Sequence, residues 1–181
     1  IAIPSFPGTG SVTLIDASGN PTNAVSVVGG TYTLDPATGS ITFVPDAGFV
    51  GTAPVVNIRV TDSLGQVGSS TYAATVNAPP LSAPSNDTSA ALEGIDQSRQ
   101  ASIPVNGSIT LVDSNNNPVT SITIAGKGTY SIDANTGVLT FSPVNGFSGA
   151  VPAATYKITD QYGQSATGTY TATVNATPPA A

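Results

Sequence analysis

The sequence predicts an all-β protein made of two tandem, Ig-like antiparallel β-sandwich domains. Three observations support this fold class. The composition is rich in β-branched residues and poor in strong helix formers, with 39% hydrophobic and only 8% charged residues, and this balance favours strands. The 19 glycines and 15 prolines are spread out as turn signals between short alternating segments. The two halves of the chain have similar sequences, and neither has a helical apolar period.

The internal repeat defines the domain organisation. Residues 10–16 (GSVTLID) return as residues 107–113 (GSITLVD), and the match continues to the end of both halves with one residue gained. A period of about 100 residues is the size of an independent β-sandwich domain. We therefore expect repeat 1 at residues 1–80 and repeat 2 at residues 81–181, with a proline-rich linker at the start of repeat 2.

A β-hairpin lies at the centre of each repeat. It reads GTYTLDPATGSITFVPDAGFVG at residues 30–51 and GTYSIDANTGVLTFSPVNGFSG at residues 128–149. Tyr32 and Leu34 alternate with threonines, which is the pattern of a half-buried strand. A phenylalanine between two glycines closes each copy. We expect Phe49, like its counterpart in repeat 2, to fold back into the core as a plug.

The turn of this hairpin depends on an aspartate and a glycine. Asp35 and Gly39 bound the turn in repeat 1, and repeat 2 keeps them as Asp133 and Gly137 while losing the proline. An aspartate side chain can accept a hydrogen bond from a backbone N–H two residues on, and glycine adopts the left-handed conformation that follows. These two residues are therefore the ones that the turn geometry needs most.

Further strands are expected on both sides of the hairpin. In repeat 1 they cover residues 11–16, 25–28, 55–61 and 67–77, and repeat 2 has equivalents throughout. In repeat 2 a strand is also expected at residues 99–105. Residues 86–98, which precede it, form either the first strand of repeat 2 or an ordered lead-in. Repeat 1 has no equivalent of this segment, so we expect it to be the less complete domain.

Composition and charge exclude several classes of function. The chain has no Cys, so it can form neither disulfides nor thiolate metal sites. Its formal net charge of −6, with only 4 Lys and Arg residues, argues against binding to nucleic acid or to an anionic membrane. No apolar run approaches the roughly 20 residues needed to cross a bilayer. Because the first residues read like the inside of a strand, we interpret the sequence as a piece of a longer secreted protein.

The repeat resembles a known family. The runs GTYTLDPATGSITFVPDAGFVGTAP and GTYSIDANTGVLTFSPVNGFSGAVP, followed by TDSLG and TDQYG, resemble the CshA-type fibril repeat of bacterial cell-wall-anchored surface adhesins. The segment LEGIDQSRQ (residues 92–100) is similar to that family's opening segment. The resemblance implies tandem modules of an extracellular stalk or fibril on the bacterial cell surface, with ligand binding in a separate head. It implies neighbouring repeats, other fibrils or host surface proteins as partners.

No catalytic residue is assigned, and we expect that the chain is not an enzyme. It has neither His nor Cys, which removes the usual general bases and nucleophile pairs. Carboxylates remain, but the recurring aspartates all open turns, where aspartate is favoured for backbone reasons. They are Asp16, Asp35 and Asp62 in repeat 1 and Asp113, Asp133 and Asp160 in repeat 2.

No cofactor is expected, but calcium is an alternative. Four acidic residues carry the oxygen donors that calcium prefers: Asp46 in its loop, and Asp87, Glu93 and Asp96 near the junction of the repeats. Calcium bound there would stiffen the array, as in cadherin-like extenders. However, no calcium-loop motif is present, and Val144 replaces Asp46 in repeat 2.

Two functions from different classes fit these observations. The favoured one is a structural stalk module that projects a separate head, and it predicts two separate low-force unfolding events under tension. The alternative is a module that itself recognises a host protein or glycan, with Tyr162 at a hairpin tip as the candidate aromatic, although its counterpart is Leu64. An isopeptide cross-link shared by both repeats is not expected, because Arg59 in repeat 1 replaces Lys157.

Overall fold

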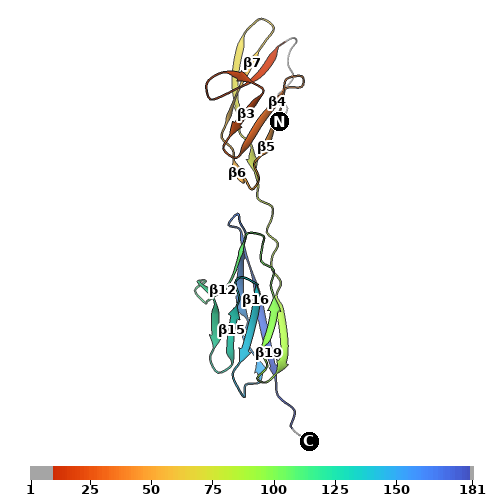
Figure 1. The fold of residues 1–181 in the computed structure, drawn as a ribbon, viewed down its shortest axis with the longest axis vertical. Helices are drawn as coiled ribbons and strands as arrows, with labels where there is room; N and C mark the ends of the chain where they lie inside the picture. Colours follow the sequence, from red (N-terminus) through yellow and green to blue (C-terminus); the bar gives the residue numbers. More distant parts are fainter. Residues whose placement is uncertain (1–9, 180–181) are drawn as a thin grey trace. The chain divides into compact units, whose positions relative to one another are not determined.

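The protein is built from β-strands and connecting turns (Figure 1). A computed structural model describes residues 10–179. The chain divides into two compact units, Ile1–Pro79 and Pro80–Ala181, which we call repeat 1 and repeat 2. Within the described range, no helix is long and apolar enough to cross a membrane. The predicted all-β sandwich class is confirmed.

Repeat 1 packs two antiparallel sheets against each other. One sheet has the strand order β2-β1-β7-β8 and the other β3-β4-β5, while β6 pairs with β9. The strands are β1 (Ser11–Ile15), β2 (Pro21–Thr22), β3 (Ala24–Val27), β4 (Gly30–Asp35), β5 (Ser40–Pro45), β6 (Gly51–Thr52), β7 (Val56–Thr61), β8 (Val67–Tyr72) and β9 (Thr75–Val76). Buried residues from both sheets, among them Leu14, Tyr32 and Ile58, form its core.

Repeat 2 repeats this plan and adds two strands at its start. Its sheets have the orders β10-β19-β18-β12-β13 and β11-β16-β15-β14, and β17 pairs with β19. The strands are β10 (Asp87–Leu92), β11 (Gln97–Gln100), β12 (Ser108–Val112), β13 (Pro118–Val119), β14 (Ser121–Ile124), β15 (Gly128–Ile132), β16 (Val138–Pro143), β17 (Gly149–Ala150), β18 (Ala154–Thr159) and β19 (Ser165–Asn175). The two added strands are β10 and β11.

The central hairpin forms as predicted in both repeats. In repeat 1, β4 and β5 pair in antiparallel register with Tyr32 opposite Phe43, and repeat 2 pairs Tyr130 opposite Phe141 in the same way. The two rings of each pair have centroids 4.7 Å apart in both repeats. Gly39 has a φ of 69°, so it takes the left-handed conformation that closes the turn. The alternation in the sequence therefore gave the correct buried face.

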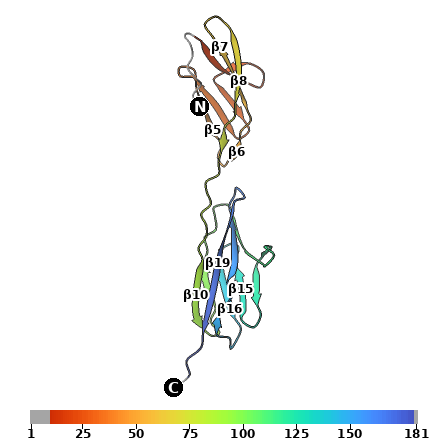
Figure 2. The same ribbon diagram turned by 180° about the vertical axis from the view of Figure 1, so that it is seen from behind.

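One pairing in repeat 2 is parallel, which differs from the expected antiparallel arrangement. β10 runs alongside the second half of β19, in register from Asp87 opposite Tyr170 to Leu92 opposite Asn175 (Figure 2). The segment before β11 is therefore the first strand of repeat 2 rather than a lead-in. Its inward side chains, those of Asp87, Ser89 and Ala91, are short, so its sequence carries no strong apolar alternation that would reveal a pairing partner.

Two predicted strands have different bounds in the structure. The expected strand 67–77 is divided into β8 and β9, whereas its counterpart in repeat 2 is the continuous β19. β10 pairs with the second half of β19 and holds it in extended form. The expected strand 99–105 is wrong in position, since β11 ends at Gln100. There the Ala101 N–H donates to the Gly137 carbonyl, and Pro104 accepts from the Gly107 N–H to form a turn.

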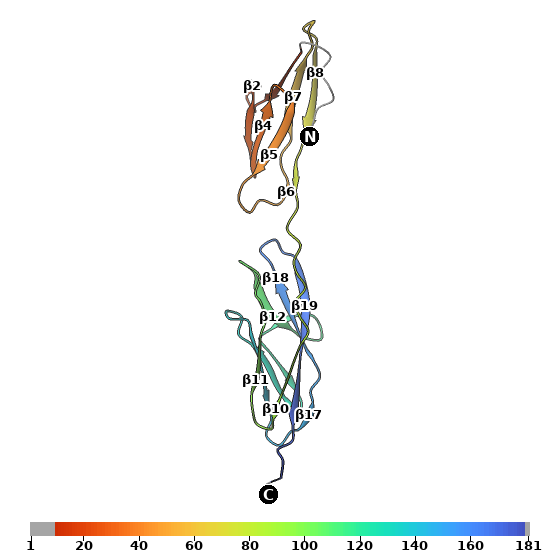
Figure 3. The ribbon, with the colours of Figure 1, turned by 90° about the vertical axis from the view of Figure 1, so that its right-hand side faces the viewer.

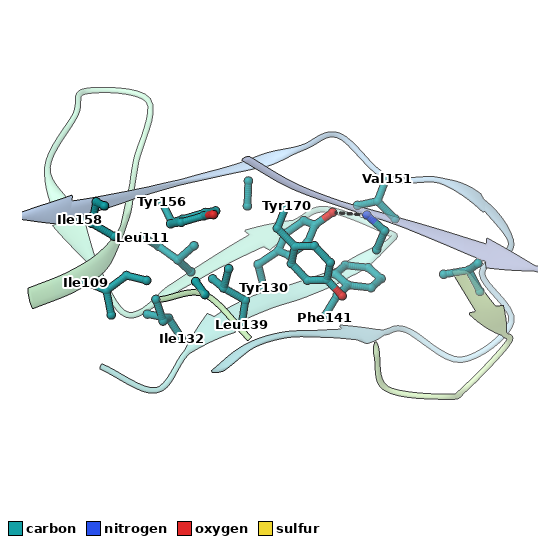
Figure 4. Packing of buried hydrophobic residues seen from close by; sticks show 14 residues of the cluster. Ile109, Leu111, Tyr130, Ile132, Leu139, Phe141, Val151, Tyr156, Ile158 and Tyr170 are labelled. Carbon is teal, nitrogen blue, oxygen red and sulfur yellow. Dashed lines mark hydrogen bonds between the residues drawn. The ribbon is translucent and has the colours of Figure 1, made fainter. Parts of the chain in front are cut away.

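The core of repeat 2 is centred on tyrosines. Tyr130, Tyr156 and Tyr170 are fully buried together with Phe141, and Figure 4 shows these rings packed among aliphatic side chains of both sheets. The Tyr130 hydroxyl accepts a hydrogen bond from the Ala172 N–H at 3.0 Å. This dashed contact in Figure 4 ties β15 of one sheet to β19 of the other.

Candidate functional site

The recurring aspartates are caps of turns. Asp16 accepts hydrogen bonds from the backbone N–H groups of Ser18 and Asn20, at 2.9 Å and 2.8 Å. Asp62 and its counterpart Asp160 make the same pair of contacts with the residues two and four positions on. Each carboxylate therefore satisfies donors of its own turn, and the prediction of turn caps is confirmed.

These contacts also favour the charged form of three turn carboxylates. The Thr38 hydroxyl, donating to Asp35, is the main cause that lowers the pKa of that carboxyl. A backbone hydrogen bond from Asn117 lowers the pKa of Asp113, and one from Asn135 lowers the pKa of Asp133. A carboxyl whose pKa lies below its usual value stays ionised at neutral pH, so none of the three is suited to act as a general acid.

The four calcium candidates occupy separate environments. The Asp87 carboxylate accepts from the Ser85 hydroxyl at 3.0 Å, and Glu93 is half-buried. Asp46 and Asp96 are exposed. Among residues 10–179, no group of three or more Asp, Glu, His or Cys side chains is placed to hold a metal ion. The absence of a cofactor stays a prediction, and calcium stays the alternative to it.

The glycine-phenylalanine loops differ between the repeats. Phe49 and Phe147 both pack partly buried against their cores, as the plug hypothesis expected. In repeat 1 the ring of Phe49 lies so close to Gly29 that an added Cβ at this glycine would overlap the ring. In repeat 2 the matching position is Lys127, whose Nζ lies 5.5 Å from the Phe147 ring centroid and donates to the Ala150 carbonyl. A cation–π contact thus replaces direct packing on the backbone.

The aromatic candidate for ligand binding is only partly accessible. Tyr162 is half-buried in the turn between β18 and β19, and its counterpart Leu64 is 81% exposed. The two repeats therefore present no shared aromatic platform at this tip. Arg59 and Lys157 lie half-buried in matching strands, β7 and β18.

A polar cluster under the first strands of repeat 2 was missed by the sequence reasoning. Gln97 is 4% exposed and is the buried polar side chain of the described core. The Ser89 hydroxyl lies 2.6 Å from the Gln97 Oε1 and 2.7 Å from the Tyr170 hydroxyl. The Gln97 amide donates to the Thr173 carbonyl at 3.0 Å. These contacts fasten β10 and β11 onto β19.

Repeat 1 has an open groove at the corresponding place. The groove has a volume of about 370 Å³ and is lined by β5 and by the segment around β9, including Phe43, Tyr72, Ala74 and Thr75. Both aromatic rings are partly exposed, whereas their counterparts Phe141 and Tyr170 in repeat 2 are fully buried. Among residues 10–79, no strand corresponds to β10 or β11.

Comparisons with solved structures find adhesion molecules at low similarity. The N-terminal four Ig domains of Dscam1 isoform 7.44 match with 17% identity, over 96% of this chain and 45% of that chain, at a TM-score of 0.39. Mouse cadherin-23 EC22-24 matches with 13% identity, over 93% of this chain and 53% of that chain, at a TM-score of 0.34. The chain spans about half the length of these structures or less. At these TM-scores the similarities support no conclusion about function.

The comparison with protein families is decisive. No curated protein sequence matches the chain significantly. The family model described as the surface adhesin CshA repetitive domain matches residues 4–76 and residues 84–174. The two matches cover most of the chain and place one copy in each repeat, in agreement with the resemblance of the central hairpins. The chain therefore belongs to the surface adhesin CshA repetitive domain family.

Proposed function

We propose that this chain is a non-enzymatic stalk segment of a cell-wall-anchored bacterial adhesin, which holds a separate ligand-binding head away from the cell. Membership of a surface adhesin family supports an extracellular adhesion module. Tandem copies of one domain support a spacer, since repetition adds length without adding a new site. The recurring carboxylates are engaged in their own turns, which supports a structural role for them.

The observation that carries the proposal is the parallel pairing of β10 with β19. These are the first and last strands of repeat 2, and they run in the same direction (Figure 2). The chain consequently enters this sandwich at one end and leaves it at the other. A six-residue pairing at about 3.3 Å per residue separates the two ends of that ladder by about 20 Å. Such a domain transmits tension along its length.

The same pairing determines how tension acts on repeat 2. A pull on the two ends of the repeat drives β10 and β19 in opposite directions along their shared ladder. The hydrogen bonds of the ladder then carry the load together instead of breaking one at a time. We therefore expect two separate unfolding events, and the event that belongs to repeat 2 should depend on this ladder.

Single-molecule pulling on the whole chain tests the proposal. The variant Ala91→Pro removes a backbone N–H from β10 and restricts its φ, so it should lower the force of one unfolding event and leave the other unchanged. The control is Ala176→Pro, just beyond the end of β19, which should change neither force. Two events whose forces both stay the same in Ala91→Pro would contradict a mechanical role for this pairing.

The alternative of a ligand-binding module has weaker support. Recognition of a glycan or host protein by the repeats needs an exposed aromatic or groove that suits the ligand. Tyr162 is half-buried and its counterpart is aliphatic. The groove of repeat 1 matches a surface that repeat 2 covers with its own strands, so the two repeats share no exposed groove at this place.

A further inference from the structure

The tetrapeptide Pro-Val-Asn-Gly occurs twice in repeat 2 and folds differently at each place. Its first copy, residues 104–107, stands directly ahead of β12, and its second copy, residues 143–146, begins at the last residue of β16. Both asparagines are exposed. In an Asn-Gly pair the side-chain amide can react with the next backbone nitrogen, because glycine has no Cβ to obstruct the approach. The two copies therefore show how the fold affects this reaction at one local sequence.

In the second copy the glycine lies inside a turn. The Phe147 N–H donates to the Val144 carbonyl at 3.2 Å, which places Asn145 and Gly146 at the two central positions of a β-turn. Gly146 has a φ of 76°, and no atom lies within 4 Å of the position that a Cβ would take. No acceptor for the Gly146 N–H is found among residues 10–179. This nitrogen is therefore free to approach the Asn145 side chain.

In the first copy the glycine closes the turn instead. The Gly107 N–H donates to the Pro104 carbonyl at 2.8 Å, and Asn106 lies inside the turn with a φ of 52°. The Asn106 side-chain amide donates to the Gln161 side chain at 3.2 Å. Gly107 is packed so closely that an added Cβ would overlap the Thr159 carbonyl. Here the backbone nitrogen can react only after its hydrogen bond has opened.

We propose that Asn145 is a site of spontaneous covalent modification in the folded protein, whereas Asn106 is protected by its turn. The Gly146 nitrogen gives its proton to hydroxide and attacks the Asn145 Cγ. A bond forms between that nitrogen and Cγ, the Cγ–Nδ2 bond breaks, and ammonia leaves after it takes a proton from water. The product is a cyclic succinimide. The turn favours this step because it keeps the reacting groups close and free of competing hydrogen bonds.

Water then opens the succinimide in one of two directions. Attack at Cγ breaks the bond from Cγ to the Gly146 nitrogen and gives aspartate at residue 145. Attack at the backbone carbonyl carbon breaks the bond from that carbon to the same nitrogen and gives isoaspartate. In isoaspartate the main chain runs through Cβ and Cγ, so the backbone gains an additional carbon. Both products carry a new carboxylate, and only isoaspartate alters the course of the chain.

The modified residue lies in the loop that carries Phe147 to the core of repeat 2. The loop joins β16 to β17, and β17 lies beside the last residues of β19 (Figure 3). A longer backbone at residue 145 disturbs the hydrogen bond from Phe147 to Val144 that closes the turn. Isoaspartate should therefore loosen the packing of Phe147, whereas aspartate should leave it in place.

Peptide mapping of the whole chain after prolonged incubation tests the proposal. The chain is kept folded at mildly alkaline pH, and its peptides are analysed by mass spectrometry for loss of ammonia and for replacement of the amide by a carboxyl group. We expect Asn145 to react at least about tenfold faster than Asn106, since a hydrogen-bonded group must open before it reacts. Equal rates at the two sites in the folded chain would overturn the proposal.

The products identify the chemical route. A protein isoaspartyl methyltransferase should label the modified chain at residue 145, because the succinimide opens partly to isoaspartate. Direct hydrolysis of the side-chain amide by water gives aspartate alone. Modified chains that contain aspartate and no isoaspartate would therefore overturn attack by the Gly146 nitrogen.

Incubation in urea separates the effect of the fold from that of the sequence. Urea removes both turns, so the two copies should react at similar rates there because their four residues are identical. The residues that follow the copies are Ser108 and Phe147. A difference between the sites that persists in urea would assign it to these neighbours and would overturn the role of the turns.

The variant Gln161→Ala tests which contact protects Asn106. It removes the side-chain partner of this asparagine and leaves the hydrogen bond from Gly107 to Pro104 in place. We expect Asn106 to remain slow in the folded variant. A reaction at Asn106 as fast as that at Asn145 would overturn protection by the backbone hydrogen bond.

Calorimetry of the separated forms measures the effect on repeat 2. The isoaspartate form should lower the melting temperature of repeat 2 by about 4–8 °C, the shift expected in a domain of this size for the loss of a modest interaction. The variant Asn145→Asp supplies the charge alone and should melt like the unmodified chain. An isoaspartate form that melts together with Asn145→Asp would overturn the loosening of the loop.

Repeat 1 supplies a matched control variant. It has Ala47 at the position of Asn145 and closes the same turn, with the Phe49 N–H donating to the Asp46 carbonyl at 3.0 Å. Asn145→Ala should therefore fold like the unmodified chain and keep its melting temperature through the incubation. A decline of repeat 2 in this variant as large as in the unchanged protein would overturn the assignment of the decline to residue 145.

Discussion

At the scale of single residues, a buried tyrosine hydroxyl holds the two sheets of each repeat together. In repeat 1, Tyr32 donates to the Pro54 carbonyl and accepts from the Ala74 N–H, both at 3.0 Å. In repeat 2, Tyr130 accepts from the Ala172 N–H in the same way. Both rings are fully buried. The hydroxyl is therefore the partner of a backbone N–H that water does not reach.

The variant Tyr130→Phe should destabilise repeat 2 alone. Removal of the hydroxyl leaves the Ala172 N–H without its partner, and an unsatisfied buried donor costs about 1–3 kcal/mol. Chemical denaturation of the whole chain measures this loss, with the transition of repeat 1 as the internal control. The matched variant Tyr32→Phe should shift the other transition instead. If repeat 2 of the Tyr130→Phe variant is as stable as the unchanged protein, the hydroxyl does not have this stabilising role.

The buried tyrosines also predict how repeat 2 responds to alkaline pH. Burial is the main cause that raises the pKa values of Tyr130, Tyr156 and Tyr170 above the usual value. In the unfolded chain these groups ionise near pH 10, while in the folded repeat they stay protonated to higher pH. At pH values where the unfolded tyrosines have ionised and the buried ones have not, the unfolded state binds fewer protons than the folded state. The free energy of unfolding therefore falls as the pH rises above about 10.

Thermal unfolding followed across alkaline pH checks this expectation. The melting temperature of repeat 2 should be constant up to about pH 9 and then decline as the unfolded tyrosines ionise. Tyrosine absorbance recorded in the same samples should show the phenolate appearing together with unfolding. Ionisation of all tyrosines at the ordinary value while repeat 2 remains folded would contradict the effect of burial.

The turn aspartates were predictable from the sequence, whereas the buried glutamine was not. Asp35 and Gly39 act within one turn of five residues, so local chemistry decides their role. Gln97 is satisfied by Ser89 and by the carbonyl of Thr173. The carbonyl of Thr173 belongs to the last strand of the repeat, and no local sequence pattern predicts a contact over that distance. Sequence alone therefore treats this glutamine as an exposed residue.

At the scale of strands, the repeats differ most at their last segment. β19 is one strand of eleven residues with neighbours on both sides of its second half. β8 and β9 are separate, and β9 has only two residues. Backbone groups paired on one side only open more readily than those inside a sheet. This segment should be the least protected part of repeat 1.

Amide hydrogen exchange measures this difference directly. We expect the amides of residues 72–77 to exchange faster than the matching amides of residues 170–175, while the β4 and β15 hairpin strands behave alike. Both segments are measured in the same sample, so the pH and temperature affect their exchange conditions equally. Equal protection of the two segments would show that β10 adds little to the stability of its neighbour.

The strands that could be predicted are those with a strong apolar alternation. Tyr32 and Leu34 in β4 mark the buried face clearly, and the structure agrees. β10 reads DTSAAL and contains only short inward side chains, so its pattern does not identify it as a strand with a partner. Its parallel pairing joins residues about eighty positions apart, and neither turn signals nor periodicity report contacts over that range.

At the scale of the whole chain, calcium is the remaining question about cofactors. The candidates Asp46, Asp87, Glu93 and Asp96 contribute to no group of three acidic side chains within the described residues. Calcium that bound only the folded protein would raise its melting temperature through mass action. We therefore expect the same two unfolding transitions in EDTA and in millimolar calcium.

Calorimetry in the two buffers, with magnesium as the control for ionic strength, tests this expectation. A rise of either transition in calcium alone would contradict it. In that case, Asp87→Asn and Asp96→Asn would identify which carboxylates act as ligands. The same preparation in small-angle scattering would then report whether the ion alters the dimensions of the chain.

The parallel first strand has a consequence for the order of folding. β10 is among the first parts of repeat 2 to be synthesised, yet its partner is the final strand, so the repeat cannot complete its sheet until residue 175 is present. Contacts that span a whole domain form slowly. During this interval an unpaired β10 can meet the last strand of another copy in the same array. Neighbouring repeats with divergent sequences would form fewer such exchanged pairs than identical ones.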